Sequence, residues 1–249
     1  MFTVAIARPE HRELRAGALT GILAVAVSTV SLGVLGMRLL HLSGAYVPKV
    51  LLVFAADAAL VLLTLPGAHR FVRMGAANQV TIVRGALIAL LAGLLGEQGG
   101  HAMAAAAVVI ASVAMVLDGV DGWLARRSGM VSAFGARFDM ETDAVFVAVL
   151  ALLVWQFGKA GAWVLLAGMM RYLFAAAVAA LPRLQRPVPS TLRGKTIALL
   201  QMIALIVALS PLCSVSVSSS VAAAGLLALV LSFALDVMWL LRRPPLHVS

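Results

Sequence analysis

The chain has 249 residues, of which 63% are hydrophobic and only 12% are charged. An average soluble domain carries about 25% charged residues, so this composition excludes a soluble globular protein and predicts a polytopic membrane protein. The net charge of +9 does not indicate nucleic-acid binding, because the basic residues lie at the ends of apolar runs and no basic stripe with interleaved aromatic residues is present in the sequence.

Apolar runs of about 17–25 residues are long enough to cross a bilayer as helices. We expect an all-α integral membrane helix bundle with about eight transmembrane helices. The expected helices cover residues 16–40, 47–66, 79–96, 102–125, 136–157, 161–181, 195–211 and 220–241. The stretch 182–194 contains three prolines and three arginines and predicts a basic loop, because proline cannot continue a helix.

The distribution of basic residues orients these helices. If the N-terminus is cytoplasmic, the inner segments hold 14 of the 19 Lys and Arg residues. The outer edges then hold Arg38, Lys49 and Lys159, while Arg84 and Arg171 lie within the spans. The positive-inside rule therefore places both termini on the cytoplasmic side of an inner or cytoplasmic membrane.

Half of the ten acidic residues lie in one short window, from Asp118 to Asp143. Carboxylates at membrane depth are costly and normally mark a functional site. One helical face in this window carries two carboxylates, two small residues and an arginine suited to phosphate: Asp118, Asp121, Gly122, Ala125 and Arg126. A second face carries Gly135, Asp139 and Asp143 at intervals of four residues.

The two faces can oppose each other across the link 127–134 and offer four carboxylates to one pocket. Hard oxygen ligands fit Mg²⁺, Mn²⁺ or Ca²⁺ rather than zinc. A two-metal site can clamp a pyrophosphate and stabilise its attacking and leaving oxygens. The alternative is that the acids pair with Arg126, Arg127 and Arg137 at the membrane surface, but surface ion pairs require no such matching of faces. The predicted orientation places this window on the cytoplasmic side.

The pattern D-x2-D-G-x2-A-R-x8-G-x3-D-x3-D, from Asp118 to Asp143, resembles the signature of the CDP-alcohol phosphotransferase family. A shorter segment, N-x-V-T-x-x-R from Asn78 to Arg84, is similar to the start of that family's first core helix. The resemblance implies a six-helix core over residues 76–249. It says nothing about the two helices of an N-terminal extension, residues 1–75.

The resemblance also implies the activity: metal-dependent transfer of a phosphatidyl group from CDP-diacylglycerol to a small polar alcohol, with release of CMP, in phospholipid biosynthesis. It implies Mg²⁺ or Mn²⁺ as cofactor, membrane lipid as a partner, and a homodimer. Asp118, Asp121, Asp139 and Asp143 would bind the metal ions, and Asp143 would also be the general base. The residues expected at the CDP moiety are Gly122, Ala125, Arg126, Gly135, Asn78 and Thr81.

Three basic residues are candidates for binding a phosphorylated acceptor. Arg171 is embedded in the sixth run, and a buried arginine usually faces the bundle interior or a cavity. Arg193 and Lys195 open the seventh helix in a stretch loosely similar to phosphatidylglycerophosphate synthases. The alternative role for these residues is anchoring at the cytoplasmic surface.

The alternatives to this function come from within the family and from other classes of protein. Within the family, the donor could be CDP-choline or CDP-ethanolamine, with a lipid hydroxyl as acceptor. A divalent-cation transporter would spread its acids through the membrane depth, and a non-catalytic scaffold would lack one or more of the aspartates. Asp57 is the only acid within the first two expected spans, and we expect it to be a structural partner, because no second carboxylate lies near it in the sequence.

Overall fold

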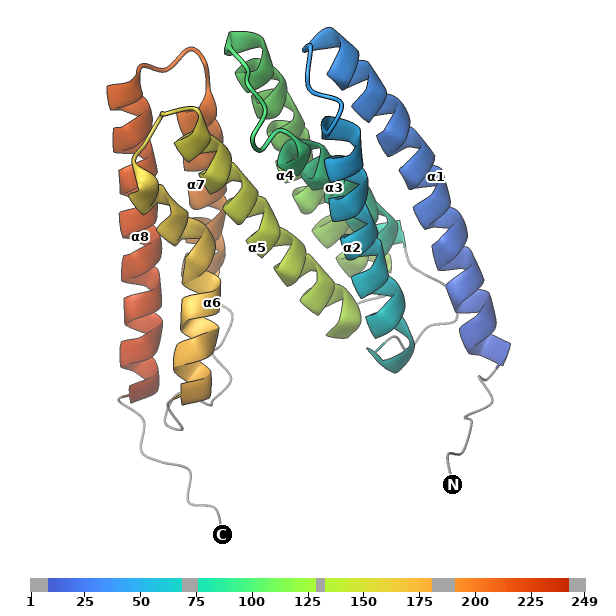
Figure 1. The fold of residues 1–249 in the computed structure, drawn as a ribbon. Helices are drawn as coiled ribbons and strands as arrows, with labels where there is room; N and C mark the ends of the chain where they lie inside the picture. The colour runs from blue at the N-terminus through green and yellow to red at the C-terminus, as the bar shows by residue number, and fades with distance from the viewer. Residues whose placement is uncertain (1–8, 69–75, 129–132, 181–190, 242–249) are drawn as a thin grey trace. The chain divides into compact units, whose positions relative to one another are not determined.

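The computed structural model describes residues 9–68, 76–128, 133–180 and 191–241 (Figure 1). The helices are α1 (Pro9–Leu39), α2 (Tyr46–Ala68), α3 (Ala76–Gly93), α4 (His101–Ser128), α5 (Ala133–Gln156), α6 (Leu165–Ala180), α7 (Leu192–Leu209) and α8 (Val215–Leu241), with a short 3₁₀ turn, η1 (Ala162–Val164). Each expected run corresponds to one of these eight α-helices, and no strand occurs in the described residues. The all-α prediction is confirmed.

Four helices are long and apolar enough, by their described residues, to cross a membrane. These segments are Leu19–Leu39, His101–Leu124, Leu192–Leu209 and Val215–Leu240. Two shorter apolar segments, Asn78–Gly93 and Ala162–Ala177, lie in α3 and α6 with the preceding turn. The lengths and hydropathy therefore agree with an integral membrane protein, while the cytoplasmic orientation stays a prediction.

The chain forms two compact units, which divide within α5 between Asp143 and Ala144. In the first unit α2 packs closely on α3. A Cβ atom at Gly93 would lie 2.5 Å from Val50 Cγ2, so only glycine allows this approach. The Tyr46 hydroxyl, on α2, donates a hydrogen bond to the carbonyl of Leu90 at 3.1 Å.

One end of this helix pair is tied by a buried carboxylate. Glu97 accepts hydrogen bonds from the backbone N–H of Ser43 at 2.7 Å, from its hydroxyl at 2.8 Å and from Lys49 Nζ at 2.6 Å. The side chain of Glu97 is only 4% exposed, so these donors replace the water that it has lost. The loop between α1 and α2 is thereby fixed to the residues that follow α3.

The second unit contains the rest of α5 with α6, α7 and α8. Gly168 brings α6 against the backbone of α5, where a Cβ atom would lie 2.7 Å from Ala148 Cα. Lys159 Nζ donates to the carbonyls of Ser210 at 3.0 Å and Cys213 at 2.6 Å, and so satisfies acceptors in the turn after α7. Small residues that let helices approach closely are typical of packing in lipid.

Candidate active site

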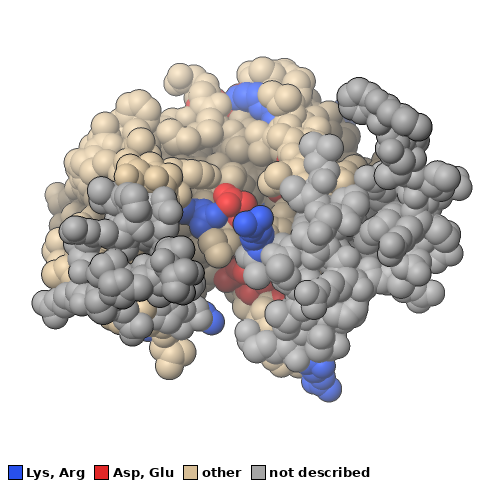
Figure 2. Space-filling model, turned by 90° about the horizontal axis from the view of Figure 1, so that it is seen from below, with Lys and Arg blue, Asp and Glu red and all other residues tan. Residues whose placement is uncertain are grey.

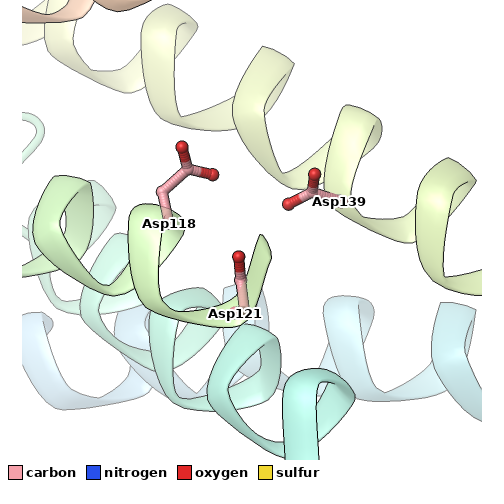
Figure 3. Close-up of side chains that lie close together, drawn as sticks. All are labelled: Asp118, Asp121 and Asp139. Carbon is pink, nitrogen blue, oxygen red and sulfur yellow. The ribbon is translucent and has the colours of Figure 1, made fainter. Parts of the chain in front are cut away.

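Two helices of the first unit bring three of the predicted aspartates together. Asp118 and Asp121 point from α4 toward Asp139 on α5 (Figure 3). One oxygen from each of these carboxylates lies within 4.8 Å of the others. The two faces predicted from the spacing therefore do oppose each other.

A buried arginine from α3 lies at the centre of these acids. Arg84, which is 0% exposed, donates through Nη1 to Asp118 and to Asp121 Oδ2, the latter at 2.8 Å. Its Nη2 donates to the Asp139 carboxylate and to Asp143 Oδ1, the latter at 3.2 Å. One guanidinium thus contacts all four aspartates of the motif. Planar guanidinium donors suit such shared carboxylate contacts.

The importance of Arg84 is the main feature that the sequence reasoning missed. Arg84 closes the segment that begins at Asn78, and it is one of the two arginines that the predicted orientation assigns to neither edge of an expected span. An arginine within a span requires a partner, and the nearest excess of carboxylates in the sequence is the aspartate window. That pairing is a signal in the sequence itself that connects α3 to the site.

The charge of the cluster is suited to cations. Four ionised carboxylates and one guanidinium leave a formal charge of −3. Asp121 is the most buried of the four, with 5% of its side chain exposed, and Asp139 is the most open, at 44%. Asp or Glu side chains, in red, reach the surface that Figure 2 shows from below. An excess of hard oxygen donors that solvent can reach fits one or two divalent cations such as Mg²⁺ or Mn²⁺.

Two other predicted residues on α3 lie near this cluster. The hydroxyl of Thr81 donates a hydrogen bond to Asp121 Oδ2 at 3.0 Å, so it fixes the most buried carboxylate. Asn78 is buried at 8% exposure one helical turn earlier. The backbones of Gly122 and Gly135 belong to α4 and α5.

The remaining predicted site residues have less defined surroundings. The side chains of Ala125 and Arg126 lie outside the part of the structure that is described. In the second unit, Arg171 is half-buried on α6. Lys195 is exposed in the first turn of α7, which Thr191 caps by accepting a hydrogen bond from the N–H of Gly194 at 3.1 Å.

Arg193 has a partner of its own. Its Nη2 donates to Asp236 Oδ1, and this ion pair joins α7 to α8. About 41% of the Arg193 side chain remains exposed, so the pair contributes little to stability and leaves donors of the guanidinium facing solvent.

Fold and site together define an integral membrane protein whose helices present an acidic, cation-suited centre. A sequence model of the CDP-alcohol phosphatidyltransferase family matches residues 74–237, and the chain belongs to this family. Members transfer a phosphatidyl or phosphoalcohol group from a CDP-linked donor and are generally dependent on divalent metal. A search of curated proteins finds no match to the chain. The matched residues contain Arg84 and all four aspartates, and they leave α1 and α2 outside.

Proposed function

We propose that the protein transfers a phosphatidyl group from CDP-diacylglycerol to a small polar alcohol and releases CMP. The observation that carries this proposal is the four-aspartate cluster around Arg84, which lies inside the family match. The acceptor oxygen would form a bond to the phosphorus that carries the diacylglycerol. The bond from that phosphorus to the bridging oxygen of the pyrophosphate would break, and CMP would leave with that oxygen.

The four aspartates would hold Mg²⁺ or Mn²⁺ in this reaction. Divalent ions, when bound, neutralise pyrophosphate charge and make the phosphorus more open to attack. Thr81 would keep Asp121 oriented through its hydrogen bond. Asp143 would take the proton of the acceptor hydroxyl, a role supported by its place at the partly exposed side of the cluster, with 33% of its side chain accessible.

Binding of the donor would fall to the residues around these acids. Asn78 and Thr81 on α3, with Gly122, Ala125, Arg126 and Gly135, would contact the CDP moiety. Small residues leave room for the nucleotide against a helix backbone, and Arg126 would bind its phosphate. We expect the site to face the cytoplasm and the protein to be a homodimer in an inner or cytoplasmic membrane.

The acceptor would be a phosphorylated alcohol if Arg171, Arg193 and Lys195 bind it. Their charge supports this class, because each can offer donors to a phosphate. Replacing Arg171 or Lys195 by Gln should then raise the KM for a phosphorylated acceptor and leave the KM for CDP-diacylglycerol nearly unchanged. A variant that changes neither KM would assign that residue to surface anchoring.

The decisive experiment measures CMP release by the purified full chain with CDP-diacylglycerol and Mg²⁺ or Mn²⁺. The acceptor panel would include glycerol 3-phosphate, inositol phosphate, inositol, serine and choline. Asp143→Asn should lower kcat by roughly 10²–10⁴-fold, the usual contribution of general base catalysis. Glu141→Gln is the matched control, because it removes a neighbouring carboxylate of α5 that lies outside the four-aspartate motif. CMP release from CDP-choline with a lipid acceptor, and none from CDP-diacylglycerol, would instead establish the alternative donor.

A further inference from the structure

Two buried polar atoms on the helix pair α2 and α3 have no hydrogen-bond partner in the described part of the chain. They are Nε of Arg84 and Oδ2 of Asp57 on α2. One is a donor on a cation and the other an acceptor on a carboxyl group, so their chemistry is complementary. Buried polar groups are normally paired, and an unpaired one requires an explanation.

The two residues come from neighbouring positions on the packed pair α2 and α3. The Asp57 carboxyl group lies directly against the α3 backbone at Gly85, the residue that follows Arg84. A Cβ atom at Gly85 would lie 2.5 Å from Asp57 Oδ2 and 3.2 Å from its Cγ, so glycine is needed for this approach. Arg84 is also the charged group that acts electrostatically on Asp57.

Arg84 occupies the oxygens that divalent cations would need. Its Nη1 and Nη2 contact all four aspartates, and the side chain has no exposure to water that could receive it. A guanidinium that gives up some of these contacts therefore requires another acceptor inside the protein. In the described residues of the first unit, Asp57 Oδ2 is the one buried side-chain acceptor left without a partner.

We propose that Asp57 is a positioning residue that accepts the Arg84 guanidinium when divalent cations occupy the four aspartates. Arg84 is then an internal counter-ion that stabilises the carboxylates before the cations bind. Asp57 makes the release of Arg84 less costly, and so raises cation affinity without touching the cation. The inference rests on the proposed function, because it requires the aspartates to bind divalent metal. It gives α2, which lies outside the family match, a part in building the site.

The test is Mn²⁺ binding to the full chain in detergent. Binding is measured from the electron paramagnetic resonance signal of the Mn²⁺ that remains free. Asp57→Asn should weaken Mn²⁺ binding by about 10- to 100-fold, the equivalent of one charge-assisted hydrogen bond. Without metal, the thermal midpoint of Asp57→Asn should not fall below that of the unmodified protein, because the substitution replaces a buried carboxyl group that has an unpaired oxygen by a neutral amide. In the Arg84→Met background, Asp57→Asn should change the Mn²⁺ affinity by less than about twofold, because the guanidinium through which Asp57 acts is then absent. The four proteins form a double-mutant cycle that measures this coupling.

Gly85→Ala provides a second route that changes neither charged residue in the sequence. Its new Cβ would displace the Asp57 carboxyl group, so it should weaken Mn²⁺ binding as Asp57→Asn does. Gly33→Ala on α1 is the control, because its Cβ would meet its nearest side chains at 3.8 Å.

The outcomes separate this inference from the proposed function. Failure of the unmodified protein to bind Mn²⁺ would overturn the metal site itself. Normal binding by the unmodified protein, with equal or tighter binding by Asp57→Asn and Gly85→Ala, would overturn the role of Asp57 alone. An equal loss from Asp57→Asn with and without Arg84 would also overturn it, because the effect would not act through the guanidinium. If Asp57→Asn does not fold, the comparison of Gly85→Ala with Gly33→Ala decides between these results.

Discussion

Removing the central guanidinium should make the stability of the protein depend on divalent metal. Arg84→Met keeps the length of the side chain and removes the only positive charge that contacts the four aspartates in the described structure. Breaking a buried ion pair by loss of one partner costs about 3–5 kcal/mol. Three of the four carboxylates have side chains between 29% and 44% exposed, so water can partly replace the lost guanidinium. We therefore expect a cost at the lower end of this range, about 3 kcal/mol. For a chain of this size that loss lowers the thermal midpoint by roughly 6–12 °C.

Added Mn²⁺ should restore most of this loss, because the cations then supply the missing positive charge. The assay is thermal unfolding in detergent with EDTA or with millimolar Mn²⁺, for the unmodified protein and the variant. Arg127→Met is the control: Arg127 is an exposed basic residue of α4 that lies over the Trp123 ring at 5.0 Å, and its loss should cost less than about 1 kcal/mol. An equal drop for Arg84→Met with and without Mn²⁺ would refute the reasoning, since Arg84 would then only tie helices together.

Three further predictions concern packing, pH and metal. Gly168→Ala should lower stability by about 1–3 kcal/mol, because its Cβ would lie 2.7 Å from Ala148 Cα; equal thermal midpoints for it and Gly21→Ala, whose Cβ meets open space, would contradict this. Burial raises the pKa of Glu97, but hydrogen bonds, led by that from Lys49, and the Lys49 charge together hold this pKa below its ordinary value. The stabilisation from Glu97 is therefore present above the unfolded pKa of about 4.3 and is lost as the pH falls through the lower folded pKa. The free energy of unfolding of the unmodified protein and of Glu97→Gln can be compared by denaturation from pH 7 downward. The difference between them should shrink below a pH of about 4.3. A difference that stays constant with pH would contradict a stabilising role for the ionised Glu97. Exhaustive chelation should abolish CMP release, and Mg²⁺ or Mn²⁺ should restore it; activity that survives chelation would exclude the proposed role of metal.

The number and order of helices could be predicted from apolar run length, but their ends could not. The run expected over 195–211 begins at Leu192 in the structure, because Thr191 supplies the N-cap. The run expected over 161–181 opens with the 3₁₀ turn η1 before α6 begins at Leu165. Run length reports the thickness of the bilayer, whereas helix ends depend on local caps that hydropathy does not record.

The aspartate faces could be predicted because both lie within single helices, where residue spacing alone fixes which side chains share a face. The positions of Arg84 and Asp57 could not be predicted in the same way. Each depends on how α3 packs against another helix, and tertiary packing leaves no periodic trace in one sequence. The sequence predicts Asp57 only as a structural partner, and the structure places it against Gly85, the residue that follows Arg84.

The packing of α2 on α3 shows why helices outside the family match can still affect the site. Both Gly85 and Gly93 face α2, and at each of them a Cβ atom would lie 2.5 Å from an α2 side chain. These two close approaches fix the rotation of α3 about its axis. That rotation directs Thr81 and Arg84 toward Asp121, which both of them contact. The geometry of the aspartate cluster therefore depends on α2, although none of the four aspartates belongs to it.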